Sequence, residues 1–165
     1  KMNLALMLLL AAAVLAGCAL EPAGSGSVPS GETARVLSVT DGDTIDVLLD
    51  GVEESVRYLS INTPERDQPC YNESRSANIG LVQGQTVRLE RDVSDRDQYG
   101  RLLRFVYVGE ESVNERLLRD GWAEAVEYEP DTSRTAYYRT LEQEAAETDL
   151  GCHPTGIFND GTLTR

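Results

Sequence analysis

The sequence predicts a domain of mixed α and β structure, and three observations carry this prediction. Residues 35–40 alternate apolar and polar side chains up to the turn pair Asp41-Gly42, and residues 44–49 are rich in β-branched side chains. The pair Asp50-Gly51 then indicates a second hairpin that leads into a long strand over 52–61. Three successive antiparallel strands tend to curl into a small barrel. Helix start and stop signals in the second half of the chain supply the α part.

The later elements follow from periodicity and capping signals. After the meander we expect a helix, two strands, a second helix, a short extended piece and a final helix, over residues 73–82, 86–91, 102–108, 112–120, 122–128 and 132–148. Ser112 is placed to cap the second helix, with Glu115 three residues later and Gly121 as its C-terminal stop. Asp131, directly after Pro130, is expected to cap the final helix.

The N-terminal residues are expected to be removed before folding. Residues 4–14 form an unbroken apolar run of signal-peptide length, too short to span a bilayer comfortably as a permanent helix. The run ends in residues 15–18, Leu-Ala-Gly-Cys, which look like a bacterial lipobox with Cys18 as the lipid attachment site. An ordinary signal peptide with a chance cysteine is the alternative.

The chain is therefore divided into four parts. Residues 1–17 are the expected signal peptide with lipobox, and 18–32 are a flexible tether rich in Gly, Ser and Pro. Residues 33–152 are the folded domain, long enough for one compact core and not for two, and 153–165 are a C-terminal tail. This division predicts an extracytoplasmic protein, lipid-anchored at the cell membrane or secreted, which we expect to be a monomer.

The charge balance is strongly acidic. The chain holds 15 Lys+Arg against 28 Asp+Glu, a net charge of −13, and Lys1 is its only lysine. Proteins that bind nucleic acid usually draw affinity from broad basic surfaces through counterion release. A polyanionic partner would need a local attraction here, part of which a bound Ca²⁺ could supply.

Three segments concentrate residues suited to cleaving a phosphodiester, namely 41–44, 56–65 and 99–101. Together they hold oxygen donors for a hard cation, a carboxylate that can act as a base for water, and two guanidiniums that can bind the charge developing on phosphorus. Taken singly, each feature has a structural explanation: Asp-Gly turns are common, and arginines often form structural salt bridges.

In order and spacing, these segments resemble the thermonuclease (staphylococcal nuclease-like) family, over residues 34–150. The resemblance implies an α+β fold, a five-stranded OB-type β-barrel with three helices. It also implies a nuclease that hydrolyses phosphodiester bonds of DNA and RNA with Ca²⁺ and leaves 3′-phosphates.

The resemblance implies a metal site and its surroundings. Asp43, Asn62 and the backbone carbonyl of Thr63 would bind the ion, with Asp41 behind them. The best-known family members have aspartate where this chain has Asn62, and Ca²⁺ affinity falls with the charge of its ligands. A buried asparagine that only caps the turn is the competing interpretation of Asn62.

The resemblance also assigns roles in catalysis. Glu65, which Pro64 presents from a stiff turn, would be the general base for water. Arg57 and Arg101 would bind the phosphate, because guanidinium forks match phosphate oxygens. Period-two alternation along 52–61 puts Arg57 and Asn62 on opposite faces of the strand.

Substrate contacts are implied at two tyrosines. Tyr99 and Tyr128 match positions that contact the nucleotide in the family, whereas Gln98 and Val126 stand where a lysine and a stacking tyrosine are found. Stacking contributes about 1–3 kcal/mol per base, so these two departures predict weaker substrate binding.

The remaining cysteines form an even pair. Cys70 and Cys152 would be in a compartment that permits disulfides, and a bridge would pin the last helix to the loop after Glu65. Two free thiols remain equally open from the sequence. His153, the only histidine, is expected at the surface.

Two other functions stay open alongside the nuclease. One is a non-catalytic OB-type lipoprotein that binds nucleic acid, which the acidic charge and the departures at Asn62, Gln98 and Val126 favour. The other is a structural envelope lipoprotein without a nucleic-acid ligand.

Overall fold

The structure is a computed structural model that describes residues 31–159. The expected signal peptide and the lipid attachment site at Cys18 lie outside the described residues, as does nearly all of the tether. Among residues 31–159, no helix has the length and apolar character needed to cross a membrane.

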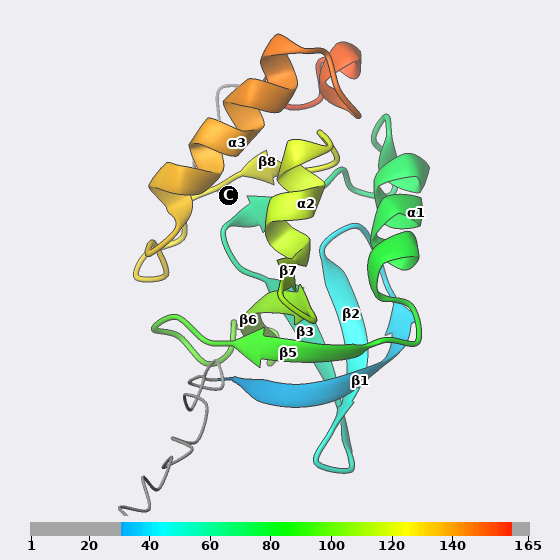
Figure 1. Cartoon of the computed structure of the whole chain (residues 1–165), viewed down its shortest axis with the longest axis vertical. Coiled ribbons are helices and arrows are strands. Elements are labelled where there is room, and N and C mark those ends of the chain that lie inside the picture. The colour runs from blue at the N-terminus through cyan, green and yellow to red at the C-terminus, as the bar shows by residue number, and fades with distance from the viewer. Residues whose placement is uncertain (1–30, 160–165) are drawn as a thin grey trace, which may run out of the picture.

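Five strands form a closed barrel (Figure 1). In chain order they are β1 (Glu32–Val39), β2 (Thr44–Leu49), β3 (Val52–Tyr58), β5 (Thr86–Glu90) and β6 (Leu102–Val108). They pair in the order β3-β2-β1-β5-β6, and a parallel pairing of β3 with β6 closes the cylinder. The predicted α+β fold, a five-stranded OB-type barrel with three helices, is confirmed.

Three helices and three short strands complete the domain (Figure 1). The helices are α1 (Tyr71–Val82), α2 (Val113–Arg119) and α3 (Thr135–Glu147), followed by a 3₁₀ turn, η1 (His153–Thr155). The short strands are β4 (Ile61–Asn62), which pairs with β8 (Glu124–Ala125), and β7 (Glu111–Ser112), which extends the sheet at β6. Helix α2 lies between α1 and α3 and also packs on β6, so the helices form one layer against the barrel.

The core joins the inside of the barrel to the helix layer. Its fully buried side chains come from the five barrel strands, from β4 and from all three helices, among them Ile45, Val56, Ile61, Val106, Leu117 and Tyr138. The ring of Phe105 meets that of Tyr138 edge to face at 6.0 Å, which links the barrel to α3. Ser112 caps α2 as predicted, since its hydroxyl accepts the N–H of Glu115.

The third strand ends earlier than predicted, and this changes which side chains meet. Regular pairing stops at Tyr58, because Ser60 takes a left-handed conformation with φ of 58°. The chain then turns into β4, so the strict alternation expected along 52–61 does not hold. Arg57 and Asn62, predicted on opposite faces, are in contact instead.

Asp131 does not cap the final helix. Helix α3 begins at Thr135, and its N-cap position is Arg134. The Asp131 carboxylate is buried and accepts the backbone N–H groups of Val93 and Ser94. These two N–H groups lie in a loop without strand pairing, so they need an acceptor, and Asp131 supplies it.

Candidate active site

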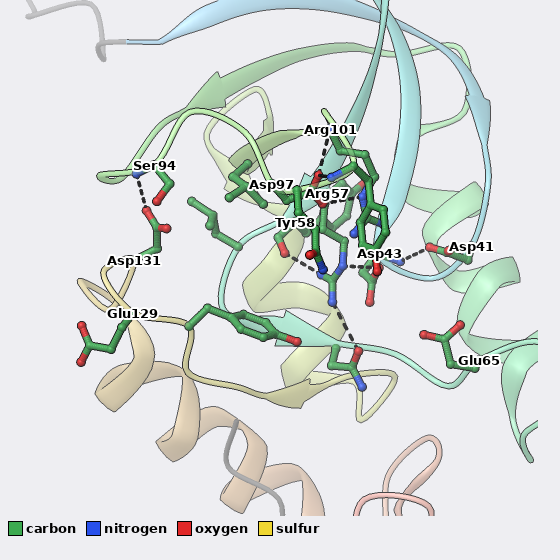
Figure 2. Close-up of a pocket in the computed structure, with 16 residues that line it drawn as sticks. Asp41, Asp43, Arg57, Tyr58, Glu65, Ser94, Asp97, Arg101, Glu129 and Asp131 are labelled. Atoms are coloured by element: carbon green, nitrogen blue, oxygen red, sulfur yellow. Dashed lines mark hydrogen bonds and ion pairs between the residues drawn. The ribbon is translucent and has the colours of Figure 1, made fainter. Parts of the chain in front are cut away.

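The three segments singled out in the sequence converge on one pocket of about 630 Å³. It opens where the β1–β2 turn, the end of β3 and the loop before β6 meet. Eight of the predicted residues line it, namely Asp41, Asp43, Arg57, Asn62, Glu65, Tyr99, Arg101 and Tyr128. Figure 2 shows Asp43 and Arg57 side by side, with Asp41 and Glu65 on one side and Glu129 and Asp131 on the other.

Asp43 is the centre of the polar network in the pocket. One carboxylate oxygen pairs with Nε of Arg57 at 3.1 Å, and the other accepts both the backbone N–H and the hydroxyl of Thr63 at 2.9 Å. Its side chain is nearly buried, so these donors replace water around a charged group. Thr63 itself does not line the pocket but lies buried behind Asp43.

Arg57 is held in one orientation by four interactions. Besides Asp43, its guanidinium donates to the carbonyls of Tyr58 and Ile61 and, at 3.3 Å, to Oδ1 of Asn62. These contacts occupy four of the five guanidinium N–H donors, and the side chain is 11% exposed. Arg57 therefore enters any reaction as a preorganised cation at the base of the pocket.

Helix α1 fixes the turn that carries the two aspartates. Asn78 donates its amide to the carbonyl of Asp41, and Arg75 donates to the carbonyls of Val39 and Thr40. The hydroxyl of Tyr58 donates in turn to Asn78. The acidic turn is thereby bound to the helix layer as well as to the barrel.

Burial and the neighbouring charge of Asp43 raise the pKa of Asp41 above its ordinary value. Hydrogen bonds to the carboxylate, one of them from the backbone N–H of Asp43, oppose that shift in part. Two carboxylates in one turn repel each other, and a cation bound between them would relieve the repulsion.

Glu65 lies at the rim of the pocket. It follows Pro64 in the loop between β4 and α1, where its backbone N–H donates to Oε1 of Gln68 at 2.6 Å. The residue is exposed, and within residues 31–159 no hydrogen bond or ion pair of its carboxylate is observed. A carboxylate in this position can take a proton from a water molecule in the pocket.

Arg101 is held by Asp97, four residues earlier in the loop before β6. Its Nε donates to Oδ2 of Asp97 at 2.7 Å, while Oδ1 of the same carboxylate accepts the backbone N–H groups of Tyr99 and Arg101. Burial opposes the charge on Asp97, but these hydrogen bonds outweigh it and hold the pKa of that carboxyl below its ordinary value. The side chain of Arg101 is 31% exposed, and its two terminal nitrogens remain available to a ligand.

Both predicted substrate-contacting tyrosines line the pocket. Tyr99 is 76% exposed and lies 5.5 Å from the guanidinium of Arg101, close enough for a cation–π contact. Tyr128 lines the pocket from the segment that follows β8. Gln98 also lines the pocket, whereas Val126 is fully buried and is not part of the lining.

The residues fit a hard cation by their donor chemistry. Carboxylate, amide and carbonyl oxygens are the ligands that Ca²⁺ takes, and Asp41, Asp43 and Asn62 supply them in the pocket. Within residues 31–159 no group of three or more His, Cys, Asp or Glu side chains is placed to hold a metal ion. The carboxylates that could bind a calcium ion here are therefore those of Asp41 and Asp43, and neutral oxygens and water would complete the ligand set.

Sequence reasoning missed three residues that orient predicted ones. Asp97 precedes Arg101 by four positions, and that spacing was a usable signal for the ion pair. Glu124 accepts a hydrogen bond from the amide of Asn62, and nothing in the sequence connects residues 62 positions apart. Asn78 on α1 is a third case, since its contact with the acidic turn depends on the tertiary fold.

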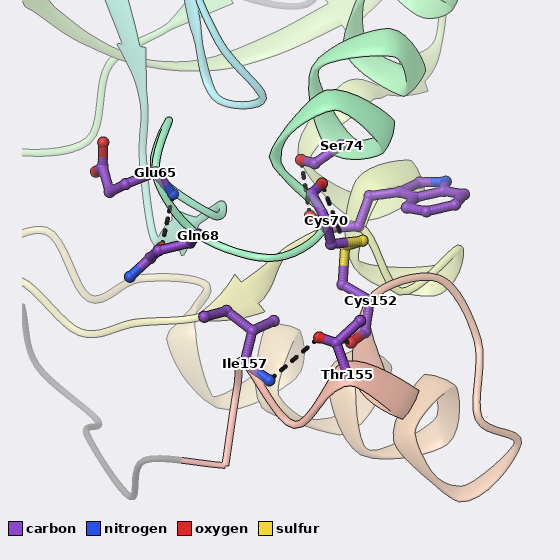
Figure 3. The surroundings of a disulfide bond; sticks show 8 residues. Glu65, Gln68, Cys70, Ser74, Cys152, Thr155 and Ile157 are labelled. Carbon is purple, nitrogen blue, oxygen red and sulfur yellow. Dashed lines mark hydrogen bonds between the residues drawn. A yellow bond between two sulfur atoms is a disulfide. The ribbon is translucent and has the colours of Figure 1, made fainter.

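A disulfide joins Cys70 to Cys152 beside the pocket (Figure 3). Cys70 occupies the N-cap position of α1, five residues after Glu65, and Cys152 precedes the 3₁₀ turn. The loop that carries Glu65 is thus tied to the C-terminal segment. His153, next to Cys152, is half-buried against the ring of Phe158, and burial lowers its pKa.

Fold and pocket together define a small OB-type barrel protein with paired arginines and hard oxygen donors in one cleft. The family model described as Staphylococcal nuclease homologue matches residues 55–152. The chain belongs to this family.

Named relatives support the same assignment. Endonuclease YncB of Bacillus subtilis (strain 168) is 42% identical over 139 residues, which cover 76% of this chain and 66% of that protein. SPbeta prophage-derived endonuclease YokF of the same organism is 46% identical over 118 residues, 67% of this chain and 40% of that protein. Thermonuclease of Staphylococcus hyicus is 36% identical over 118 residues, 68% of each chain.

Proposed function

We propose that this protein is a Ca²⁺-dependent endonuclease that hydrolyses phosphodiester bonds of DNA and RNA. The observation that supports it most is the convergence of Arg57, Arg101, Glu65 and the acidic turn on one pocket. The relatives named as endonucleases and thermonuclease support the same reaction class.

The proposed chemistry is an in-line displacement at phosphorus. Glu65 takes a proton from water as the water oxygen bonds to phosphorus, and the bond from phosphorus to the 5′-oxygen breaks. The leaving 5′-oxygen takes a proton from solvent, so the products are a 3′-phosphate and a 5′-hydroxyl. Arg101 offers its two terminal nitrogens to the phosphate oxygens, and Arg57 offers its remaining N–H. Bound Ca²⁺ would add positive charge at the acidic turn, where Asp43 and Asn62 would hold it.

The test is digestion of plasmid DNA and of RNA, with CaCl₂ or with a chelator. We expect cleavage only with calcium and 3′-phosphate ends on the products. Glu65→Gln should lower the rate by about 10²-fold or more, because a general base contributes that much. Glu73→Gln, on the exposed first turn of α1, is the matched control. Cleavage by Glu65→Gln at the wild-type rate would remove Glu65 from the mechanism.

A non-catalytic nucleic-acid-binding protein is the second candidate. The pocket lining favours it in one respect: the neutral side chains of Asn62 and Gln98 line the pocket where the family resemblance implies an aspartate and a lysine. Binding of a labelled oligonucleotide without cleavage at millimolar calcium would support this function over the nuclease.

We also propose that the protein works outside the cytoplasm, attached through a lipid on Cys18. The support is the apolar run at 4–14 followed by the lipobox-like residues 15–18. Metabolic labelling with a radioactive fatty acid should mark the protein in cells, and Cys18→Ser should abolish the label. Equal labelling of both forms would contradict the anchor.

A further inference from the structure

A buried carboxylate outside the pocket lining contacts one of the proposed metal ligands. Glu124 on β8 is 2% exposed and lies opposite Asn62 in the β4–β8 pair. Nδ2 of Asn62 donates to Oε1 of Glu124 at 2.9 Å. Asn62 is itself 7% exposed, so both partners are shielded from water.

The oxygen and the nitrogen of the Asn62 amide have hydrogen-bond partners of opposite kind, a donor and an acceptor. The oxygen accepts from Nη2 of Arg57, which cannot accept, and the nitrogen donates to a carboxylate, which in its ionised form cannot donate. Turning the amide over would set NH₂ against guanidinium and oxygen against carboxylate. Arg57 and Glu124 thus select one amide orientation, with the oxygen on the pocket side.

The same pairing explains why an amide stands at position 62. An aspartate there would replace the amide donor and place two carboxylates at hydrogen-bond distance in a buried site, where like charges repel. With asparagine on β4 and glutamate on β8, the two strands share one negative charge and one donor. Replacing Asn62 by aspartate, or Glu124 by a side chain without an acceptor, breaks this match.

We propose that Glu124 is a positioning residue that fixes the Asn62 amide with its oxygen toward the pocket, the two residues acting as a matched pair. As far as calcium is concerned, this inference rests on the proposed function. The chain Glu124–Asn62–Arg57–Asp43 then runs from β8 through β4 and β3 to the acidic turn.

The first test needs no metal and no substrate. Melting temperatures are measured in a chelator for wild type, Asn62→Asp, Glu124→Gln and the double variant. We expect Asn62→Asp to lower the melting temperature by about 5 °C or more. The double variant should recover most of that loss, because a glutamine amide can donate to the new carboxylate. Additive effects of the two changes would overturn the matched pair.

The second test separates orientation from charge by calorimetric titration with CaCl₂. Glu124→Gln keeps an acceptor for Nδ2 of Asn62 and should bind calcium within about threefold of wild type. Glu124→Leu removes the acceptor and should weaken binding about 10–100-fold, as loss of a residue that orients a ligand typically does. Equal weakening in both variants would show that Glu124 acts through its charge and would overturn the positioning role, as would wild-type affinity in Glu124→Leu.

Glu142→Leu is the matched control for general damage to β8. Glu142 accepts the backbone N–H of Ala125 on the same strand, and no contact between it and Asn62 is observed among the described residues. It should retain calcium affinity close to wild type. If the wild-type protein neither binds calcium nor cleaves nucleic acid, the proposed function fails, and the melting temperatures still decide whether the pair exists.

Discussion

Gly42 lies between the two aspartates of the acidic turn, at a position with no room for a Cβ. A Cβ at this position would lie 2.7 Å from Cβ of Thr63 and 2.3 Å from the hydroxyl oxygen of Ser74. Ser74 can rotate, but Cβ of Thr63 moves only with its backbone, and Thr63 binds Asp43. Glycine is needed here because a Cβ does not fit. The backbone conformation does not require it, since φ of Gly42 lies outside the left-handed region.

Gly42→Ala should therefore destabilise the fold and displace Asp43. We expect a loss of about 1–3 kcal/mol in the free energy of unfolding, the usual cost of overpacking, with a loss of nuclease activity. Gly80→Ala is the control: this exposed position in α1 has no atom within 4 Å of the new Cβ, so alanine should stabilise the helix. Urea unfolding measures both, and a neutral Gly42→Ala would show that the turn adapts.

Single residues also show how far sequence reasoning reached. Asp43, Arg57, Glu65 and Arg101 were predicted because their residue types match one chemistry, and the fold brings all four to one pocket. The role of Glu124 could not be predicted from the sequence, because its contact with Asn62 depends on the pairing of β4 with β8, which no local pattern reveals. The backbone carbonyl of Thr63 stays a predicted ligand, while its N–H and hydroxyl donate to Asp43.

At the scale of elements, strand and helix patterns predicted the order of the domain, and the errors came at its junctions. The strand over 52–61 divides at Ser60, where a left-handed residue turns β3 into β4. Helix α3 starts three residues later than predicted, because Asp131 serves a neighbouring loop. In both cases a tertiary contact decided a boundary that propensity alone could not place.

The contribution of the loop before β6 to the stability of the fold should depend on pH in the acid range. Its carboxylate, Asp97, binds Arg101 and two backbone N–H groups, and its pKa lies below the ordinary 3.8. A carboxyl whose pKa is lower in the folded than in the unfolded protein stabilises the fold at pH values above its unfolded-state pKa. This stabilisation is lost as the pH falls through the folded-state pKa. The pH range over which this stabilisation is lost therefore begins near 3.8 and extends to lower pH.

Asp97→Asn should lower the melting temperature at pH 7, and the difference from wild type should shrink as the pH drops below about 3.8. Asp67→Asn, at an exposed position in the loop after β4, is the control and should follow wild type. A pH-independent difference between Asp97→Asn and wild type would mean that the ion pair with Arg101 adds no stability.

On the scale of the whole molecule, charge and covalent structure act together on the pocket. The chain carries a net charge of −13, so a nucleic acid meets repulsion over most of the protein. Among the described residues that line the pocket, the cations are Arg57 and Arg101. A site of this kind depends on precise placement more than on a broad basic surface, and the helix layer provides that placement.

The disulfide links the first helix of this layer to the segment after its last helix. It closes a span of 82 residues and joins the start of α1, which holds the acidic turn, to the segment after α3. Cys152 is fully buried, and its backbone N–H donates to the carbonyl of Gly121, so the bridge anchors into the end of α2 as well. Separating the sulfurs would free both the C-terminal segment and the loop that carries Glu65.

Cys70→Ser/Cys152→Ser should therefore lower the free energy of unfolding by about 2–5 kcal/mol, since closure of a loop this long restricts the unfolded chain strongly. Urea unfolding of oxidised wild type, reduced wild type and the double variant measures the effect, after non-reducing peptide mapping has identified the Cys70–Cys152 peptide. The reduced protein should match the double variant. Because Arg75 and Asn78 still hold the acidic turn, the double variant should keep most of its activity at temperatures where it remains folded. Equal stability of all three proteins would show that packing alone holds α1 against the C-terminal segment.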